Sequence, residues 1–172
     1  MITTQPNISE SRQYIASHQT YFMQKSDYQK ENVMPVITSY YSVDTGGYGD
    51  TKDITPAADK FLDESGLTDG TLTLFVPGST GGVTTIEFEP GAVRDLHDLF
   101  EKIIPEDAHY HHNERWHDGN GFSHVRAAMI GPSLTVPFTD GKLTLGTWQQ
   151  IILLDFDNGP RTRKVVFQFM GE

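Results

Sequence analysis

From about residue 33 onward, the pattern of hydrophobic and polar residues switches repeatedly between an extended and a helical period. Runs rich in β-branched and aromatic residues predict strands. Between two of these strands stands Asp140-Gly141, a dipeptide that strongly favours a tight hairpin, while Asn158-Gly159 marks a looser loop between the last two. The expected strands cover residues 36–41, 71–77, 83–88, 134–138, 143–145, 148–156 and 164–169.

Three segments carry apolar residues at helical spacing. Thr55 and Pro56 mark the start of the first helix, since proline suits the first helical position, and Gly66 stands where a C-cap belongs. Because the helices are intermixed with hairpins and do not alternate regularly with strands, the sequence predicts an α+β fold, a single domain with a mainly antiparallel sheet and flanking helices. The expected helices cover residues 56–65, 93–103 and 124–130.

Residues 1–32 differ from the rest of the chain, because they are rich in glutamine and serine yet carry tyrosines and other apolar residues every seven positions. This spacing places two adjacent rows on one helical face. We therefore predict a helical N-terminal extension over residues 1–32, packing on the body or on a neighbouring subunit, ahead of a domain over residues 33–172. A disordered leader is the alternative. The repeating residues are Tyr14, Tyr21 and Tyr28 beside Ile8, Ile15 and Phe22.

Length and charge narrow the classes of function. The 172 residues suit one globular domain, and the absence of cysteine excludes disulfides, thiolate metal centres and cysteine nucleophiles. The 13 Lys and Arg against 23 Asp and Glu give a net charge of −10, the wrong sign for binding nucleic acid or an anionic membrane. Any anionic substrate must therefore meet a local positive site. Without a visible secretory signal or an apolar run of membrane-spanning length, we expect a cytoplasmic protein.

Histidines gather in one short stretch, where five of the seven lie between residues 109 and 124. Neutral imidazole is a common ligand for zinc, and a nearby carboxylate, Asp118 or Glu114, can supply an oxygen donor. In an extended segment, residues 109 and 111 share one face and residue 112 takes the other, so these three histidines cannot all bind one ion. The five are His109, His111, His112, His117 and His124.

We expect His112 and His124 to converge, because residues 118–121 between them, Asp-Gly-Asn-Gly, favour a turn that doubles the chain back. His124 then lies at a helix start. There the helix macrodipole disfavours a charged imidazole and leaves the ring ready to accept a metal or a hydrogen bond. The alternative, a loop of solvated or hydrogen-bonded histidines, carries similar weight from the spacing alone.

The glycine-rich loop over residues 77–82 can turn backbone N–H groups and the hydroxyls of Ser79 and Thr80 toward an anion. A plain turn between strands is the alternative. Arg126, just beyond His124, is expected to present its guanidinium to the same cavity. Two other arginines near the last strand are expected to be surface charges, Arg161 and Arg163.

Two further places offer chemistry. Glu87 follows a predicted strand and is a candidate acid, base or ligand, with a solvated strand-end carboxylate as the alternative. Trp148 and Gln149 stand at a strand entrance, where an aromatic side chain can stack on a flat ring and an amide can hydrogen-bond its edge. Core packing explains Trp148 equally well.

Five motifs follow one another in a fixed order, namely Glu87, Tyr110-His111-His112-Asn113, residues 118–127, residues 131–137 and Leu145-Gly146-Thr147-Trp148-Gln149. Together they resemble the YjbQ family, whose members are also called secondary thiamine-phosphate synthases. The resemblance covers residues 33–172 and implies the family's α+β domain, usually a homotrimer. The family usually has a histidine where this chain has Gly78, and the other two family histidines map onto His112 and His124.

The implied reaction joins a hydroxymethylpyrimidine diphosphate to a thiazole phosphate, giving thiamine phosphate and pyrophosphate, with a divalent metal, zinc or magnesium. The alternatives are another metal-dependent reaction on a phosphorylated small molecule and a non-enzymatic trimeric protein that binds a metal or a ligand. The expected catalytic residues are His112, His124, Arg126 and Glu87. The expected substrate-binding residues are Ser79, Thr80, Gly81, Asn120, Trp148 and Gln149. The expected metal ligands are His112, His124 and Asp118.

Overall fold

The computed structural model describes residues 14–16, 19–21 and 34–172, and it divides the chain into two units, residues 1–33 and 34–172. In the first unit, β1 (Tyr14–Ala16) pairs antiparallel with β2 (Gln19–Tyr21), and Tyr14 lies opposite Tyr21. The predicted helix is therefore wrong for these six residues, because a seven-residue spacing also sets two tyrosines opposite each other across a hairpin. The rest of that predicted helix lies outside the described residues.

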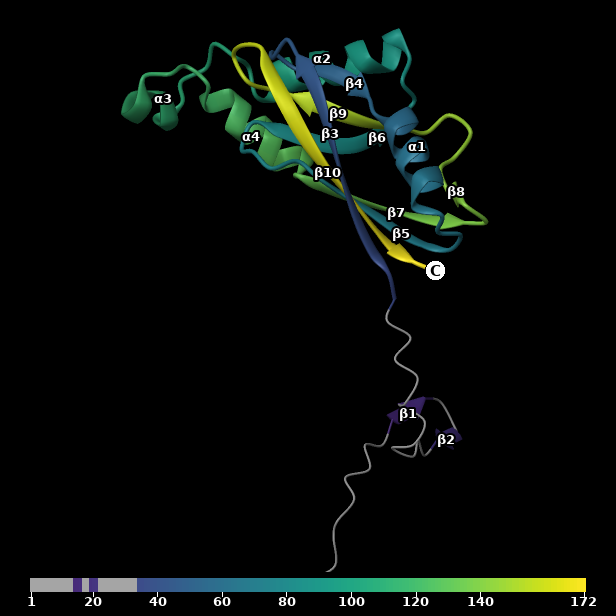
Figure 1. Cartoon of the computed structure of the whole chain (residues 1–172). Coiled ribbons are helices and arrows are strands. Elements are labelled where there is room, and N and C mark those ends of the chain that lie inside the picture. The colour runs from purple at the N-terminus through teal and green to yellow at the C-terminus, as the bar shows by residue number, and fades with distance from the viewer. Residues whose placement is uncertain (1–13, 17–18, 22–33) are drawn as a thin grey trace, which may run out of the picture. The chain divides into compact units, whose positions relative to one another are not determined.

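The second unit contains two antiparallel sheets, which confirms the predicted α+β class (Figure 1). Figure 1 shows the two longest strands, β3 and β10, running side by side. The larger sheet has the order β3 (Val36–Thr45), β10 (Arg161–Gly171), β5 (Gly70–Phe75), β7 (Ser133–Thr139) and β8 (Lys142–Leu143). The smaller sheet has the order β4 (Asp50–Asp53), β9 (Gln150–Asp155) and β6 (Gly81–Ile86).

The helices follow local capping signals. The first ends at Gly66, whose φ of 70° is the left-handed conformation that the sequence predicts there. The second begins three residues before the expected position, because the Glu89 carboxylate accepts hydrogen bonds from the backbone N–H groups of Gly91 and Ala92. The described helices are α1 (Thr55–Ser65), α2 (Pro90–Ile103), α3 (His111–Trp116) and α4 (Gly121–Ile130). None of them is long and apolar enough to cross a membrane.

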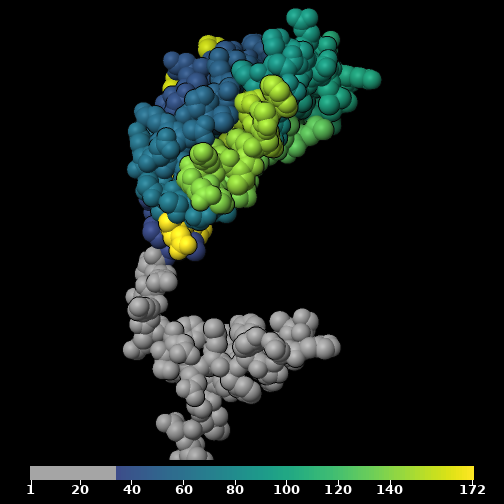
Figure 2. Space-filling view, turned by 90° about the vertical axis from the view of Figure 1, so that its right-hand side faces the viewer, coloured from purple at the N-terminus to yellow at the C-terminus, as the bar shows by residue number. Residues whose placement is uncertain are grey.

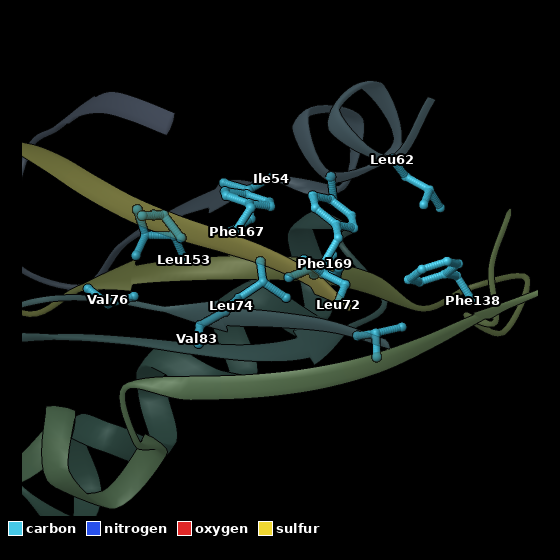
Figure 3. Packing of buried hydrophobic residues seen from close by; sticks show 14 of the residues in the cluster. Ile54, Leu62, Leu72, Leu74, Val76, Val83, Phe138, Leu153, Phe167 and Phe169 are labelled. Carbon is cyan, nitrogen blue, oxygen red and sulfur yellow. The ribbon is translucent and has the colours of Figure 1, made fainter. Parts of the chain in front are cut away.

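The core consists of two hydrophobic clusters that meet along β9. Ile151 and Leu153 belong to the larger cluster, and Figure 3 shows Leu153 beside other buried members such as Phe167. The partly buried Phe61 packs edge to face on Phe167, with ring centroids 5.4 Å apart. Ile152 and Leu154 belong to the second cluster. Both faces of β9 are therefore buried, which explains the continuous apolar run of this strand.

Of the two predicted loops between the last strands, one closes a hairpin and the other connects the two sheets. Asp140 and Gly141 form the expected tight hairpin, with φ values of 52° and 68°, between the paired residues Thr139 and Lys142. The looser Asn158-Gly159 loop does not join a hairpin, because β9 belongs to the smaller sheet and β10 to the larger one. This connection crosses between the sheets.

The crossing connection packs against the turn between β3 and β4. The backbone N–H of Tyr48 donates to the carbonyl of Asp157 over 2.6 Å. Gly47 has a φ of +76°, and a Cβ there would lie 2.5 Å from the carbonyl oxygens of both Asp157 and Gly159. Only glycine allows this approach without displacing the backbone. The close contact fixes the chain just beyond β9, where the candidate site lies.

Candidate functional site

Two histidines from neighbouring helices face each other. His112 belongs to α3 and His124 to the first turns of α4, and the rings lie 4.3 Å apart between centroids with a tilt of 50°. The chain reverses between them through His117 and Gly119, whose φ values are 57° and 71°. The structure thus brings together the two rings that the Asp-Gly-Asn-Gly turn led us to expect. We call them the histidine pair.

The short helix α3, like the short strand β4, is an element that the sequence pattern missed. The six residues of α3 are too few to show a helical period, so the segment reads as irregular. Asn113 fastens it to α4, because its Oδ1 accepts a hydrogen bond of 2.8 Å from the backbone N–H of Gly121. Asp118 lies beside the histidine pair, with its Oδ2 3.4 Å from His112 Nε2. The carboxylate therefore orients one ring of the pair.

The predicted metal set offers suitable donor types, since two imidazoles and a carboxylate match zinc. Its placement is less favourable, because the Asp118 oxygen faces His112 at hydrogen-bonding range. A different group of potential ligands lies closer together. Among the residues that the structure describes, His109, His111 and Glu114 each offer one ligand atom, and these three atoms lie within 4.8 Å of one another. A metal at the histidine pair would therefore require rearrangement of Asp118.

Two buried polar atoms stand at the start of α4. Asn120 Oδ1 and Ser123 Oγ have no hydrogen-bond partner among the described residues. Asn120 precedes the helix without capping it, and Ser123 is fully buried next to His124. Buried polar atoms in proteins are nearly always satisfied by protein, water or a bound molecule. These two atoms are close in sequence to His124, and the role of Asn120 in binding a substrate stays a prediction.

Arg126 does not reach the histidine pair. The prediction that its guanidinium faces the same cavity as His124 is therefore wrong. Its side chain is 1% exposed and donates to Glu101 Oε1 and to the carbonyl of Ile104, both over 2.7 Å, and to Glu106 Oε1 over 3.4 Å. Residues two apart on a helix point about 200° from each other. Arg126 is therefore turned away from His124, into the interior, where it links α4 to the end of α2.

The glycine-rich loop is supported by a different arginine. Arg163 Nη2 donates to Thr80 Oγ1 over 2.8 Å and contacts the carboxylate of Asp155. Its Nη1 lies 3.4 Å from the position that a Cβ at Gly78 would take. The expectation that Arg163 is a surface charge is wrong, because its side chain is only 11% exposed. The signal was strand alternation, since Arg163 shares the inward face of β10 with Val165.

Two buried aspartates complete this arrangement, and we call Thr80, Asp155, Asp157 and Arg163 the loop-support cluster. Asp157 Oδ2 accepts hydrogen bonds from Thr80 Oγ1 at 3.2 Å and from Arg161 Nε at 2.8 Å. Burial alone would raise the pKa of Asp157, but the hydrogen bonds from Arg161, the Asn158 backbone and Thr80 outweigh it and lower the pKa. The hydroxyl of Thr80 is thus directed into the protein, while Ser79 is exposed and Gly81 is buried in β6.

The lowered pKa of Asp157 predicts a pH-dependent stability. A carboxyl whose pKa is lower in the folded state stabilises the protein above its unfolded pKa and loses this effect as pH falls through its folded pKa. We therefore expect Asp157→Asn to destabilise the protein at pH 7, with the difference from the wild type narrowing below about pH 4. Urea unfolding of both proteins at several pH values between 7 and 3 measures this. A difference that stays constant over the range would contradict the assignment.

The loop-support cluster and the histidine pair lie at the same end of the molecule. Asn158, which follows Asp157, donates from its Nδ2 to the backbone carbonyl of Asp118 over 2.6 Å. In addition, Tyr48 stacks on Phe122 of α4 with ring centroids 6.5 Å apart. These contacts connect the glycine-rich loop, through the crossing connection after β9, to the turn that holds the histidine pair.

Three predicted residues lie at the other end of β6. In the pairing of β6 with β9, Gly81 lies opposite Asp155 and Ile86 opposite Gln150, so the two ends of β6 are about 17 Å apart. Glu87 follows Ile86, and Trp148 and Gln149 precede Gln150. A single chain therefore does not bring Glu87, Trp148 and Gln149 to the histidine pair.

The surroundings of Trp148 and Gln149 also differ from one another. Trp148 is 70% exposed, which excludes core packing, and the yellow-green segment that contains it runs along the surface in Figure 2. The side-chain amide of Gln149 is hydrogen-bonded at its nitrogen and at its oxygen. Nε2 donates to Thr85 Oγ1 over 2.9 Å, and Oε1 accepts from the Gly146 N–H over 3.0 Å. Gln149 therefore holds the local turn, and Trp148 is free to contact another molecule.

Comparisons with known sequences agree with one another. The family model described as UPF0047 protein YjbQ-like matches residues 39–172. A UPF0047 protein of Methanothermobacter thermautotrophicus is 35% identical over 139 residues, which cover 81% of this chain and 95% of that protein. The UPF0047 protein YugU of Bacillus subtilis is 36% identical over 120 residues, which cover 69% of this chain and 88% of YugU.

Solved structures show the same similarity. A crystal structure of a YbjQ-like protein of unknown function from Sulfolobus solfataricus has a TM-score of 0.77 at 28% identity, covering 81% of this chain and 99% of that one. An uncharacterised YjbQ/UPF0047 protein of Clostridium acetobutylicum has a TM-score of 0.69 at 38% identity, covering 77% of this chain and 98% of that one. The names of these relatives give a family and no activity.

Proposed function

Because the chain belongs to the UPF0047 protein YjbQ-like family, we propose that it acts on a phosphorylated small molecule at the histidine pair. The reaction to test first is the thiamine-phosphate synthase-like transfer that joins a pyrimidine diphosphate to a thiazole phosphate. The observation that carries the proposal is the approach of the His112 and His124 rings to 4.3 Å between centroids, with Asp118 beside His112. Asn120 Oδ1 and Ser123 Oγ, buried atoms at the start of the same helix, have no hydrogen-bond partner within the described part of the chain. This is a polar site at which a substrate can be held and a proton transferred.

In this transfer, the C–O bond between the pyrimidine methylene and the diphosphate breaks, and the diphosphate leaves with the electron pair. The thiazole nitrogen forms the new C–N bond. One imidazole of the histidine pair donates a proton to the departing oxygen, and Asp118 holds the ring of His112 in place. Most of the acceleration comes from positioning the two substrates and neutralising the leaving group.

The glycine-rich loop provides the anion receptor for a phosphate group of the substrate. Its backbone N–H groups and the exposed hydroxyl of Ser79 offer hydrogen-bond donors to a phosphate, and the guanidinium of Arg163, whose charge Asp155 and Asp157 balance, lies beside Gly78. The loop-support cluster fixes the loop, and Asn158 couples it to Asp118.

The histidine pair can also hold a divalent metal, with Asp118 as an oxygen ligand after rearrangement. Two imidazole nitrogens favour zinc over magnesium, which prefers oxygen ligands. A bound zinc ion would supply charge neutralisation at the leaving diphosphate. Gly78 stands where the family usually has a third histidine, so this chain offers two of the three imidazoles.

The position of Trp148 favours a second candidate function. Because Trp148 is remote from the histidine pair of its own chain, a stacked pyrimidine requires this residue from a neighbouring copy, which the proposed homotrimer would provide. Without such assembly, the site fits a phosphorylated small molecule that has no ring to stack, in another metal-dependent reaction such as phosphate-ester hydrolysis. A trimer that binds a metal or ligand without turnover is the non-enzymatic alternative.

The test is the formation of thiamine phosphate by the purified full chain. We expect His112→Ala and His124→Ala each to lower turnover by about a hundredfold, the range of one general acid or base. His117→Asn, a change at a nearby exposed histidine that suits the φ of 57° there, should leave turnover unchanged. Unchanged turnover in both variants of the histidine pair would reject their role. Phosphate-ester turnover without a pyrimidine substrate would favour hydrolysis, and ligand binding without turnover would favour the non-enzymatic protein.

A further inference from the structure

The clustered histidines separate into two groups, and one group has no part in the proposed function. His112 turns toward His124, whereas His109 and His111 meet Glu114 on the surface. We infer that His109, His111 and Glu114 form a second metal site, separate from the histidine pair, that binds a divalent transition metal such as zinc. We call these three residues the surface triad.

The donor atoms of the surface triad are close to chelating distance. His109 Nε2 lies 2.8 Å from Glu114 Oε1, and His111 Nδ1 lies 3.1 Å from Glu114 Oε2. One ligand atom from each residue lies within 4.8 Å of the other two. In a tetrahedral zinc site with bonds of about 2.0–2.2 Å, neighbouring donor atoms are about 3.3–3.6 Å apart. Small rotations of the three side chains therefore suffice to seat an ion.

These rotations meet little resistance, because the three side chains are between 59% and 91% exposed. The rings of His109 and His111 meet edge to face with centroids 5.2 Å apart, so they do not stack on each other. A bound ion would keep at least one coordination position open to solvent. Water or a ligand from another molecule can occupy that position.

The helical backbone of α3 explains why the consecutive residues His111 and His112 belong to different groups. His111 and Glu114 stand three residues apart on α3 and therefore share one helix face, and His109 precedes the helix on the same side. His112 is the next residue after His111 and points about 100° further around the helix, toward α4. A single short helix thus serves two separate groups of ligands.

The chemistry of the surface triad selects the class of metal. Two imidazole nitrogens and one carboxylate oxygen suit zinc, nickel or copper, whereas magnesium and calcium prefer sites built of oxygen. The adjacent Arg115 extends over the ring of Trp116, with its Cζ 5.5 Å from the ring centroid. The net charge of −10 favours the approach of cations to the chain as a whole.

The test uses calorimetric titration of the full chain with zinc chloride in a background that lacks the histidine pair, His112→Ala with His124→Ala. We expect this background to retain zinc binding and to lose it when His109→Ala and His111→Ala are added. His117→Asn in the same background is the matched control, because asparagine suits the left-handed backbone at this position, and it should leave binding unchanged. Circular dichroism of each variant verifies folding.

Two results overturn the inference, namely no zinc binding in the background variant and equal binding after removal of His109 and His111. If the background variant fails to fold, the comparison is made between the wild type and His109→Ala with His111→Ala, which we expect to bind one zinc equivalent fewer. Formation of thiamine phosphate should not change in that double variant. The zinc titration and the activity assay therefore fail or succeed independently.

Discussion

Replacing Arg126 with alanine is expected to lower the free energy of unfolding by about 2–4 kcal/mol, because it leaves a cavity where a buried side chain was and leaves the Ile104 carbonyl without its donor. The guanidinium is almost fully buried and serves Glu101, Glu106 and the carbonyl of Ile104 at once. Without it, the partly buried carboxylates and the carbonyl lose their donors. The rings of Phe100 and Phe122, which lie within 6 Å of its Cζ, also lose packing.

Urea unfolding measures this effect, and Arg94→Ala is the matched control because Arg94 is exposed on α2. We expect the control to change stability by less than about 0.5 kcal/mol. The combined change Arg126→Met, Glu101→Gln and Glu106→Gln should recover much of the loss, because it removes the charges together. Equal stability of the Arg126→Ala and Arg94→Ala variants would show that the buried contacts of Arg126 do not support the fold.

Arg163→Ala is expected to lower the free energy of unfolding by about 3–5 kcal/mol, since it leaves the fully buried Asp155 without its cation. Arg161→Ala is the control from the same strand. Its side chain is 54% exposed and its pairing with Asp157 is open to solvent on one side, so we expect a loss of at most about 1 kcal/mol. Thermal unfolding followed by circular dichroism distinguishes the two variants.

The same pair of variants tests the glycine-rich loop. Because Arg163 contacts Thr80 and lies beside Gly78, its removal should also abolish binding of inorganic phosphate by the folded protein, as measured by calorimetry at low temperature. Arg161→Ala should retain this binding. Phosphate binding that survives in the Arg163→Ala variant would show that the loop binds anions through its backbone alone.

Local signals predicted the parts of the fold that depend on a few neighbouring residues. The proline and glycine around residues 56–66 located α1, and Asp140-Gly141 located the hairpin between β7 and β8. The pairing of β10 with β3 and β5 was beyond reach, because the composition of the Asn158-Gly159 loop does not reveal whether the strands beside it pair with each other. Such pairing depends on contacts between distant segments.

The candidate site was predictable to a similar extent. The turn at residues 118–121 indicated the meeting of His112 and His124, since it depends on local geometry. Neither Arg126 nor Arg163 lies where it was predicted, because proximity in sequence does not show which way a side chain points: Arg126 is buried against the end of α2, and Arg163 lies inside β10 beside the glycine-rich loop. The 100° step between helix residues turns Arg126 away from His124, and the alternation of β10 places Arg163 on the inward face.

Because both faces of β9 are buried, this strand couples the unfolding of one hydrophobic cluster to that of the other. Consecutive residues from Ile151 to Leu154 belong in turn to the two hydrophobic clusters. Loosening either cluster removes the packing from one face of this strand, so we expect the two sheets to unfold as a single cooperative unit. A substitution in β9 that displaces the strand would therefore disturb the packing of both clusters.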